Sequence, residues 1–122
     1  MDLYQEEILE HYRHPHNKGI IEHADIVQKE RNSSCGDELT FYIELENEKV
    51  KHVSFEGEGC AISQAAASML TDEIEGMSIE EIKSLEKEDV LDLLGIDLGP
   101  TRLKCALLSL QGLTTGATNY SK

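Results

Sequence analysis

The sequence lacks any long run of apolar residues, and it contains no tryptophan and only two prolines. A membrane-spanning helix needs about 20 mostly apolar residues in succession, so the sequence excludes a transmembrane protein. The acidic N-terminal segment, Met1–Glu7, has no apolar stretch of the kind found in secretory signals. These absences predict a cytoplasmic protein.

Positive charge is also scarce in this sequence. Eleven Lys and Arg residues stand against 24 Asp and Glu residues, which gives a formal net charge of −13 at pH 7. Nucleic acids and anionic membrane surfaces are bound through clustered Lys and Arg, so binding to either is excluded. Metal cations and basic protein surfaces remain compatible partners. Apolar residues make up 39% of the chain and alternate with the acidic ones, which predicts a folded domain.

Hydrophobic periodicity predicts a single α+β domain over residues 1–122. Residues 2–13 have the spacing of a short amphipathic helix that ends before Pro15. Strand patterns follow at 24–30, 39–46 and 50–56. Helical patterns cover 61–75, two short segments within 78–94 and a last helix after Pro100, whereas residues 112–122 lack periodicity and are expected to form a mobile tail. This order predicts a small three-stranded antiparallel sheet with helices packed on one face.

Cysteine is the residue type on which the functional prediction depends. The chain has three cysteines, and an odd number argues against a disulfide framework. Cys35 precedes a predicted strand, Cys60 lies at a glycine-flanked junction of strand and helix, and Cys105 lies in the first turns of the last helix. None of them falls on the apolar stripe of its element, where a packing cysteine is more usual. Their placement therefore favours reactive thiols or metal ligands over inert packing.

Asp37 follows Cys35 by two residues and offers an oxygen ligand beside the three thiols. Three Cys and one Asp form a tetrahedral set for zinc. The same four groups can hold an iron–sulfur cluster with one non-cysteine ligand. Glycines at positions 36, 57 and 59 allow the backbone to approach a small bound group. At this point zinc, a cluster and a reactive thiol all remain open.

Histidines offer a weaker signal than the cysteines. His11, His14 and His16 are spaced like a metal-binding series, but the predicted helix end and Pro15 separate them, so we expect solvated or capping roles. No histidine stands next to a cysteine in the sequence, which argues against a cysteine hydrolase.

Three cysteine motifs give the sequence a specific resemblance to a known family. They are Cys-Gly-Asp at 35–37, Gly-Glu-Gly-Cys at 57–60 and the cysteine that opens the last helix. The N-terminal pattern that runs from Leu3 through His11 and Pro15 to Gly19 is similar to the opening of the same family. From residue 3 to about residue 113, the chain resembles the iron–sulfur assembly proteins of the IscU/NifU-N-terminal/SufU superfamily.

Finer details of the sequence resemble the SufU branch of this superfamily. Residues 55–64 and 102–105 are similar to the corresponding SufU motifs, and Lys104 stands where IscU-type proteins carry a histidine. Residues 98–102 do not reproduce the chaperone-binding Leu-Pro-Pro-Val-Lys segment of IscU-type proteins. The insertion that SufU proteins usually carry between the second and third cysteines is absent. Arg102 and Lys104 are candidate contacts for a partner protein.

The resemblance implies a scaffold or a sulfur acceptor rather than a conventional enzyme. Its implied ligand set is Cys35, Asp37, Cys60 and Cys105, which would hold zinc as in SufU-type proteins or a [2Fe–2S] cluster as in IscU-type proteins. The thiol that accepts sulfur would be Cys35 in the first case and Cys105 in the second. The implied partners are a cysteine desulfurase and apo iron–sulfur proteins. The alternative function is a zinc-stabilised interaction module without sulfur transfer.

Overall fold

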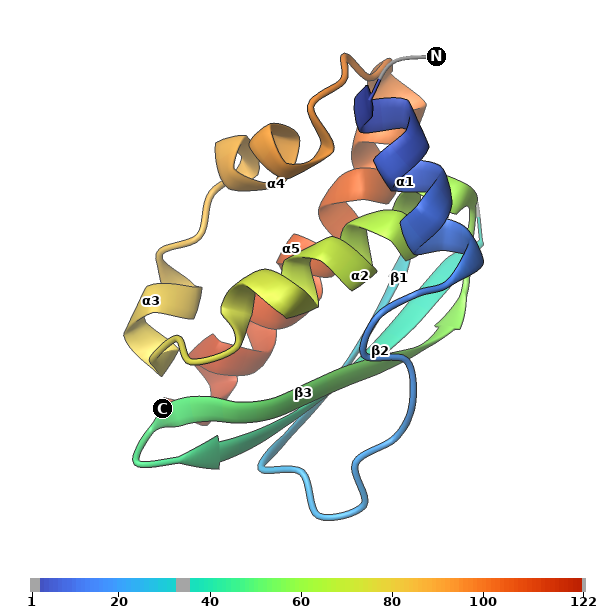
Figure 1. Cartoon of the computed structure of the whole chain (residues 1–122). Helices are drawn as coiled ribbons and strands as arrows, with labels where there is room; N and C mark the ends of the chain where they lie inside the picture. The colour runs from blue at the N-terminus through green and yellow to red at the C-terminus, as the bar shows by residue number, and fades with distance from the viewer. Residues whose placement is uncertain (1–2, 33–35, 122) are drawn as a thin grey trace.

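The computed structural model describes residues 3–32 and 36–121 of the chain. These residues form an α+β fold in the expected order of elements (Figure 1). The elements are α1 (Leu3–Arg13), β1 (Ile26–Asn32), β2 (Asp37–Glu46), β3 (Lys49–Glu58), α2 (Ala61–Ile74), α3 (Ile79–Lys83), α4 (Lys87–Leu94) and α5 (Pro100–Tyr120). Within the described ranges, no helix is both long enough and apolar enough to cross a membrane.

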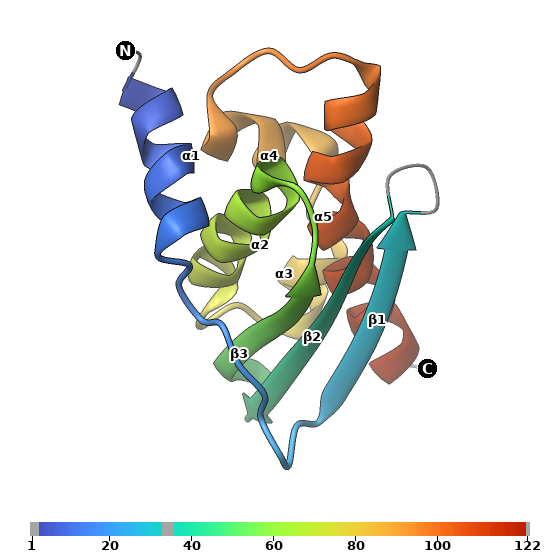
Figure 2. The same cartoon turned by 90° about the vertical axis from the view of Figure 1, so that its right-hand side faces the viewer.

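The three strands form an antiparallel sheet in the order β1-β2-β3. The alternation along β2 sends Leu39, Phe41 and Ile43 into the core, where all three are fully buried, while the residues between them are partly exposed. All the helices lie on one side of the sheet (Figures 1 and 2). The predicted fold class, a three-stranded antiparallel sheet with helices on one face, is confirmed.

Helix α2 lies at the centre of the helical layer. It packs against β3, α1, α4 and α5, and most of its residues are buried. Because its middle is made of Ala and Ser, neighbours on several sides can approach its backbone closely. Helix α1 therefore covers α2 from outside, while α5 packs directly on β1 and β2 (Figure 2).

Local capping signals in the sequence are reproduced in the structure. The Ser78 hydroxyl accepts the backbone N–H of Glu81 at 3.1 Å, and the Glu81 carboxylate accepts the backbone N–H of Ser78 at 3.1 Å, so α3 begins with the predicted capping box. Pro100 occupies the first turn of α5, where its missing N–H leaves no helical hydrogen bond unmade.

The last helix is longer than the sequence predicts. Instead of an irregular tail from residue 112, α5 continues to Tyr120. Its buried face there consists mainly of small residues, Gly112, Gly116 and Ala117, together with Leu113. Small residues produce little hydrophobic periodicity, yet they let a helix lie close to a sheet. A Cβ atom on Gly112 would lie 2.9 Å from the ring of Phe41, which shows how close this packing is.

Replacing Gly112 with alanine is expected to destabilise the fold. Overpacking against Phe41 costs about 1–3 kcal/mol, which exceeds the gain of up to about 1 kcal/mol in helix propensity. We expect a lower free energy of unfolding in denaturant titrations of Gly112→Ala. Gln111→Ala, on the exposed side of the same helix, is the matched control and should change stability little. Equal stability of Gly112→Ala and the native protein would contradict the packing.

Candidate metal centre

Asp37 is placed in the interior by the alternation of β2. It is the first residue of the strand and faces the same side as Leu39 and Phe41. Only 4% of Asp37 is exposed. A buried carboxylate is stable only where hydrogen-bond donors or cations meet it, and the sheet directs this one towards the ends of the covering helices.

Cys60 meets Asp37 at the start of α2. Its backbone N–H donates a hydrogen bond of 3.1 Å to Oδ1 of Asp37, and its Sγ lies 3.6 Å from Oδ2 of the same carboxylate. A negative charge at a helix N-terminus interacts favourably with the helix dipole. Gly59 allows this approach, since a Cβ there would collide with the Ser63 hydroxyl and lie 3.0 Å from Cγ of Asp37.

Cys105 reaches the same place from α5. It is 3% exposed and lies on the buried face of the helix, next to Ala106. The expectation that Cys105 lies off the buried stripe was wrong, because Leu103 and Leu107 are only partly buried and the core face of α5 is made of smaller residues. Burial alone therefore does not distinguish Cys105 from a cysteine that only fills the core. Its proximity to Asp37 and Cys60 does.

The structure brings three of the four predicted ligands together. One ligand atom from each of Asp37, Cys60 and Cys105 lies within 4.8 Å of the other two. Cys35, the fourth predicted ligand, lies outside the described residues. These donors come from one strand and two helices that are far apart in the sequence, so their convergence is a property of the fold.

The donor set fits a tetrahedral metal ion. With zinc–sulfur and zinc–oxygen bonds of about 2.3 and 2.0 Å, a tetrahedral site separates a sulfur from an oxygen by about 3.5 Å. The observed separation of Cys60 Sγ and Asp37 Oδ2 is 3.6 Å. Two thiols and a carboxylate can thus hold zinc together with a further ligand, and the same donors suit iron in an iron–sulfur cluster.

A hollow of about 500 Å³ opens beside the two cysteines. Its walls are mainly apolar and come from α1, α2, α5 and the segment before α5. The lining residues are Gln5, Ile8, Leu9, Cys60, Ala61, Ile62, Ile96, Thr101, Arg102 and Cys105. The contribution of α1 was not predicted, because no sequence pattern ties the N-terminal helix to the cysteines. Arg102 and Lys104 are both exposed, and Arg102 lines the hollow.

The chain is thus a small α+β domain that gathers two cysteine thiols and one carboxylate, a set of groups that could hold a metal ion, at the ends of a strand and two helices. Residues 3–122 match the family described as the NifU-like N-terminal domain, and the chain belongs to this family. The resemblance seen in the sequence motifs is confirmed.

The chain is similar to proteins described as a sulfurtransferase and as cluster assembly scaffolds. The chain is 37% identical to the zinc-dependent sulfurtransferase SufU of Bacillus subtilis, over 93% of this chain and 88% of that protein. It is 33% identical to the iron–sulfur cluster assembly scaffold protein IscU of Thermotoga maritima, over 98% and 96% of the two chains. The FiSufU structure from Fervidobacterium islandicum has a TM-score of 0.79 and 29% identity, covering 92% of this chain and 94% of that one.

Two substitutions at Asp37 are expected to separate its ligand and capping roles. Asp37→Asn keeps an oxygen that can accept the Cys60 N–H but removes the anionic ligand, so zinc affinity should fall at least about tenfold. Asp37→Ala should lose the same affinity and also about 1 kcal/mol of stability in the metal-free protein, the usual cost of a lost helix cap. Chelator competition measures the first effect and denaturant titration the second. If the Asn variant binds zinc as tightly as the native protein, Asp37 is not a zinc ligand.

Proposed function

We propose that this protein is a sulfur acceptor in iron–sulfur cluster assembly. It takes sulfur from a cysteine desulfurase and holds a metal through Cys35, Asp37, Cys60 and Cys105. The observation that carries the proposal is the convergence of Asp37, Cys60 and Cys105 within 4.8 Å beside an open hollow. The zinc-dependent sulfurtransferase and the IscU scaffold proteins among its relatives support it.

Zinc is the metal that we propose for the resting protein, and a [2Fe–2S] cluster is the alternative. The relative described as zinc-dependent shares 37% identity with the chain, and Lys104 stands where IscU-type proteins carry a histidine. A charged lysine has no lone pair for a metal. Zinc bound at this centre would keep its cysteine ligands deprotonated.

The proposed transfer is a thiol exchange at sulfur. A thiolate of this chain attacks the outer sulfur of the persulfide on the desulfurase, and a new sulfur–sulfur bond forms. The sulfur–sulfur bond of the donor breaks, and its electron pair leaves on the desulfurase cysteine as a thiolate. The sulfur is handed on without net oxidation or reduction, so no further reagent is needed.

Cys35 is the acceptor that we propose. It corresponds to the accepting cysteine of SufU-type proteins, whose motifs this sequence resembles. Cys105, the acceptor of IscU-type proteins, is 3% exposed and reaches solvent beside the hollow. That burial counts against Cys105 as the first thiol that a persulfide on another protein meets.

The hollow, with Arg102 in its wall and Lys104 exposed nearby in the sequence, supplies the proposed docking surface for the desulfurase. Leu9 and Ile62 offer apolar contacts to an incoming segment, while Arg102 and Lys104 are exposed cations in a chain of net charge −13. Two positive charges close together in the sequence of an otherwise acidic protein favour contact with an acidic or polar segment of a partner. They also help to orient that segment.

Sulfur transfer is tested with a purified cysteine desulfurase known to act with a SufU protein, using ³⁵S-labelled cysteine. The native protein should raise the desulfurase rate and become labelled, and Cys35→Ser should abolish the label. Lys49→Ala, an exposed substitution at the start of β3, is the control and should behave as native. If the Cys35→Ser variant is labelled on Cys105, then Cys105 and not Cys35 is the sulfur acceptor. Without stimulation or label on any cysteine, the interaction-module alternative holds instead.

Metal identity is tested on protein purified with and without oxygen. We expect one zinc per chain at the cysteine centre and no visible charge-transfer absorption after incubation with iron and sulfide. A stable absorbing cluster that displaces the zinc would show that the protein is a cluster scaffold rather than a zinc-bound sulfur acceptor.

A further inference from the structure

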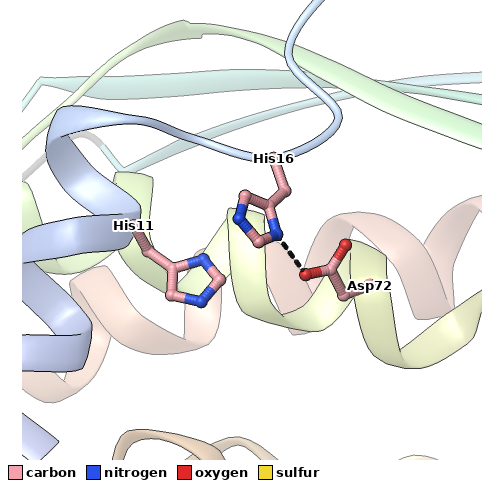
Figure 3. A group of neighbouring side chains, drawn as sticks. All are labelled: His11, His16 and Asp72. Carbon is pink, nitrogen blue, oxygen red and sulfur yellow. Dashed lines mark hydrogen bonds and ion pairs between the residues drawn. The ribbon is translucent and has the colours of Figure 1, made fainter.

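A second group of metal-ligating side chains lies on the outer side of α2. The sequence led us to expect solvated or capping histidines, but His11 of α1 and His16 of the following loop are neighbours, with ring centroids 4.5 Å apart. Asp72 of α2 completes the group (Figure 3). His14, between the two histidines in the sequence, is exposed.

The three side chains converge as metal ligands do. One ring nitrogen of each histidine and one carboxylate oxygen of Asp72 all lie within 4.8 Å of one another. His16 Nδ1 lies 2.6 Å from Oδ2 of Asp72 (Figure 3). Two imidazoles and one carboxylate form a set that zinc takes readily, with water as a fourth ligand.

Neighbouring groups hold two of these ligands in place. Nδ1 of His11 lies 2.7 Å from the hydroxyl of Ser68. In the tautomer that donates its Nδ1 proton to this hydroxyl, Nε2 carries the lone pair that a metal needs. Nδ2 of Asn17 donates to Oδ1 of Asp72 at 2.8 Å, so the carboxylate turns its other oxygen to His16. Outer hydrogen bonds of this kind orient the ligands of metal sites.

Exposure suits a cation at this place. Burial of the ring, and then the neighbouring His16, lower the pKa of His11, while Asp72, Glu7 and Glu10 act in the opposite direction as negative groups. A neutral imidazole is the form that binds a metal. His16 and Asp72 are 53% and 44% exposed at their side chains, which leaves a path for an ion from solvent. A tetrahedral site needs a nitrogen–oxygen separation of about 3.3 Å, so the His16–Asp72 pair must widen slightly, and exposed side chains have the freedom to do so.

We propose that His11, His16 and Asp72 bind a divalent zinc ion at a second site, separate from the cysteine centre. Asp72 lies twelve residues after Cys60 in the sequence, which corresponds to about 18 Å along a helix. An ion there would fasten the end of α1 and the loop after it to α2. The site shares no residue with the cysteine centre and does not depend on sulfur transfer, although the titration that tests it starts from the proposed zinc-loaded cysteine centre.

Zinc titration of the full chain tests the second site. Protein carrying one equivalent of zinc at the cysteine centre is titrated with zinc sulfate by calorimetry, and the histidine ring resonances are followed by NMR. We expect a second equivalent to bind and to shift the His11 and His16 resonances. His16→Gln and Asp72→Asn should each weaken the second equivalent at least tenfold and retain the first.

The test substitutes the exposed ligands His16 and Asp72. His11 is left unchanged because it is buried and hydrogen-bonded to Ser68, so its replacement would also disturb the fold. His14→Gln, two residues from His16 in the same exposed segment, is the matched control and should bind both equivalents. The site is refuted if the native protein, already carrying zinc at the cysteine centre, binds no further equivalent. It is equally refuted if the second equivalent persists in both His16→Gln and Asp72→Asn, or is lost in His14→Gln.

Discussion

The hydrogen bond from the Cys60 N–H to Asp37 is the contact on which the cysteine centre depends. It joins the first residue of β2 to the N-terminus of α2 at 3.1 Å. The buried carboxylate gains a donor and the favourable end of a helix dipole, while the helix gains a partner for one of its unpaired N–H groups. Because Cys60 Sγ is thereby held 3.6 Å from the other oxygen, the contact that stabilises the helix start also sets the spacing of two metal ligands.

Close packing of small residues brings in the third ligand. Gly112 and Gly116 let α5 lie against the side chains of β1 and β2, and the helix axis then carries Cys105 to the end of the sheet where Asp37 begins β2. A bulkier face on α5 would lift the helix from the sheet and move that thiol away from the carboxylate. The geometry of the centre therefore rests partly on glycines that lie two turns or more from it.

Hydrophobic periodicity in the sequence predicted the order of the helices and strands. The alternation of Leu39, Phe41 and Ile43 predicted a strand from residue 39. That β2 begins at Asp37, with its side chain facing inward, was not predicted. Periodicity also did not predict the full length of α5 or the burial of Cys105, because a face of Gly, Ala and Ser carries almost no hydrophobic signal. The meeting of His11 and His16 was missed for another reason. It depends on how the chain continues after α1 ends at Arg13, and hydrophobic periodicity does not describe such irregular segments.

Helix α2 connects the two groups of ligands. Cys60 lies at its N-terminus and Asp72 near its C-terminus, and the helix packs against α1, α4, α5 and β3. Helix α1 also connects the two regions, since Ile8 lines the hollow beside the cysteines and His11, three residues further, belongs to the proposed second site. An ion that fastens His11 and His16 to Asp72 would restrain one wall of the hollow. Its effect on partner docking would arise through the position of α1 and without any direct contact with the thiols.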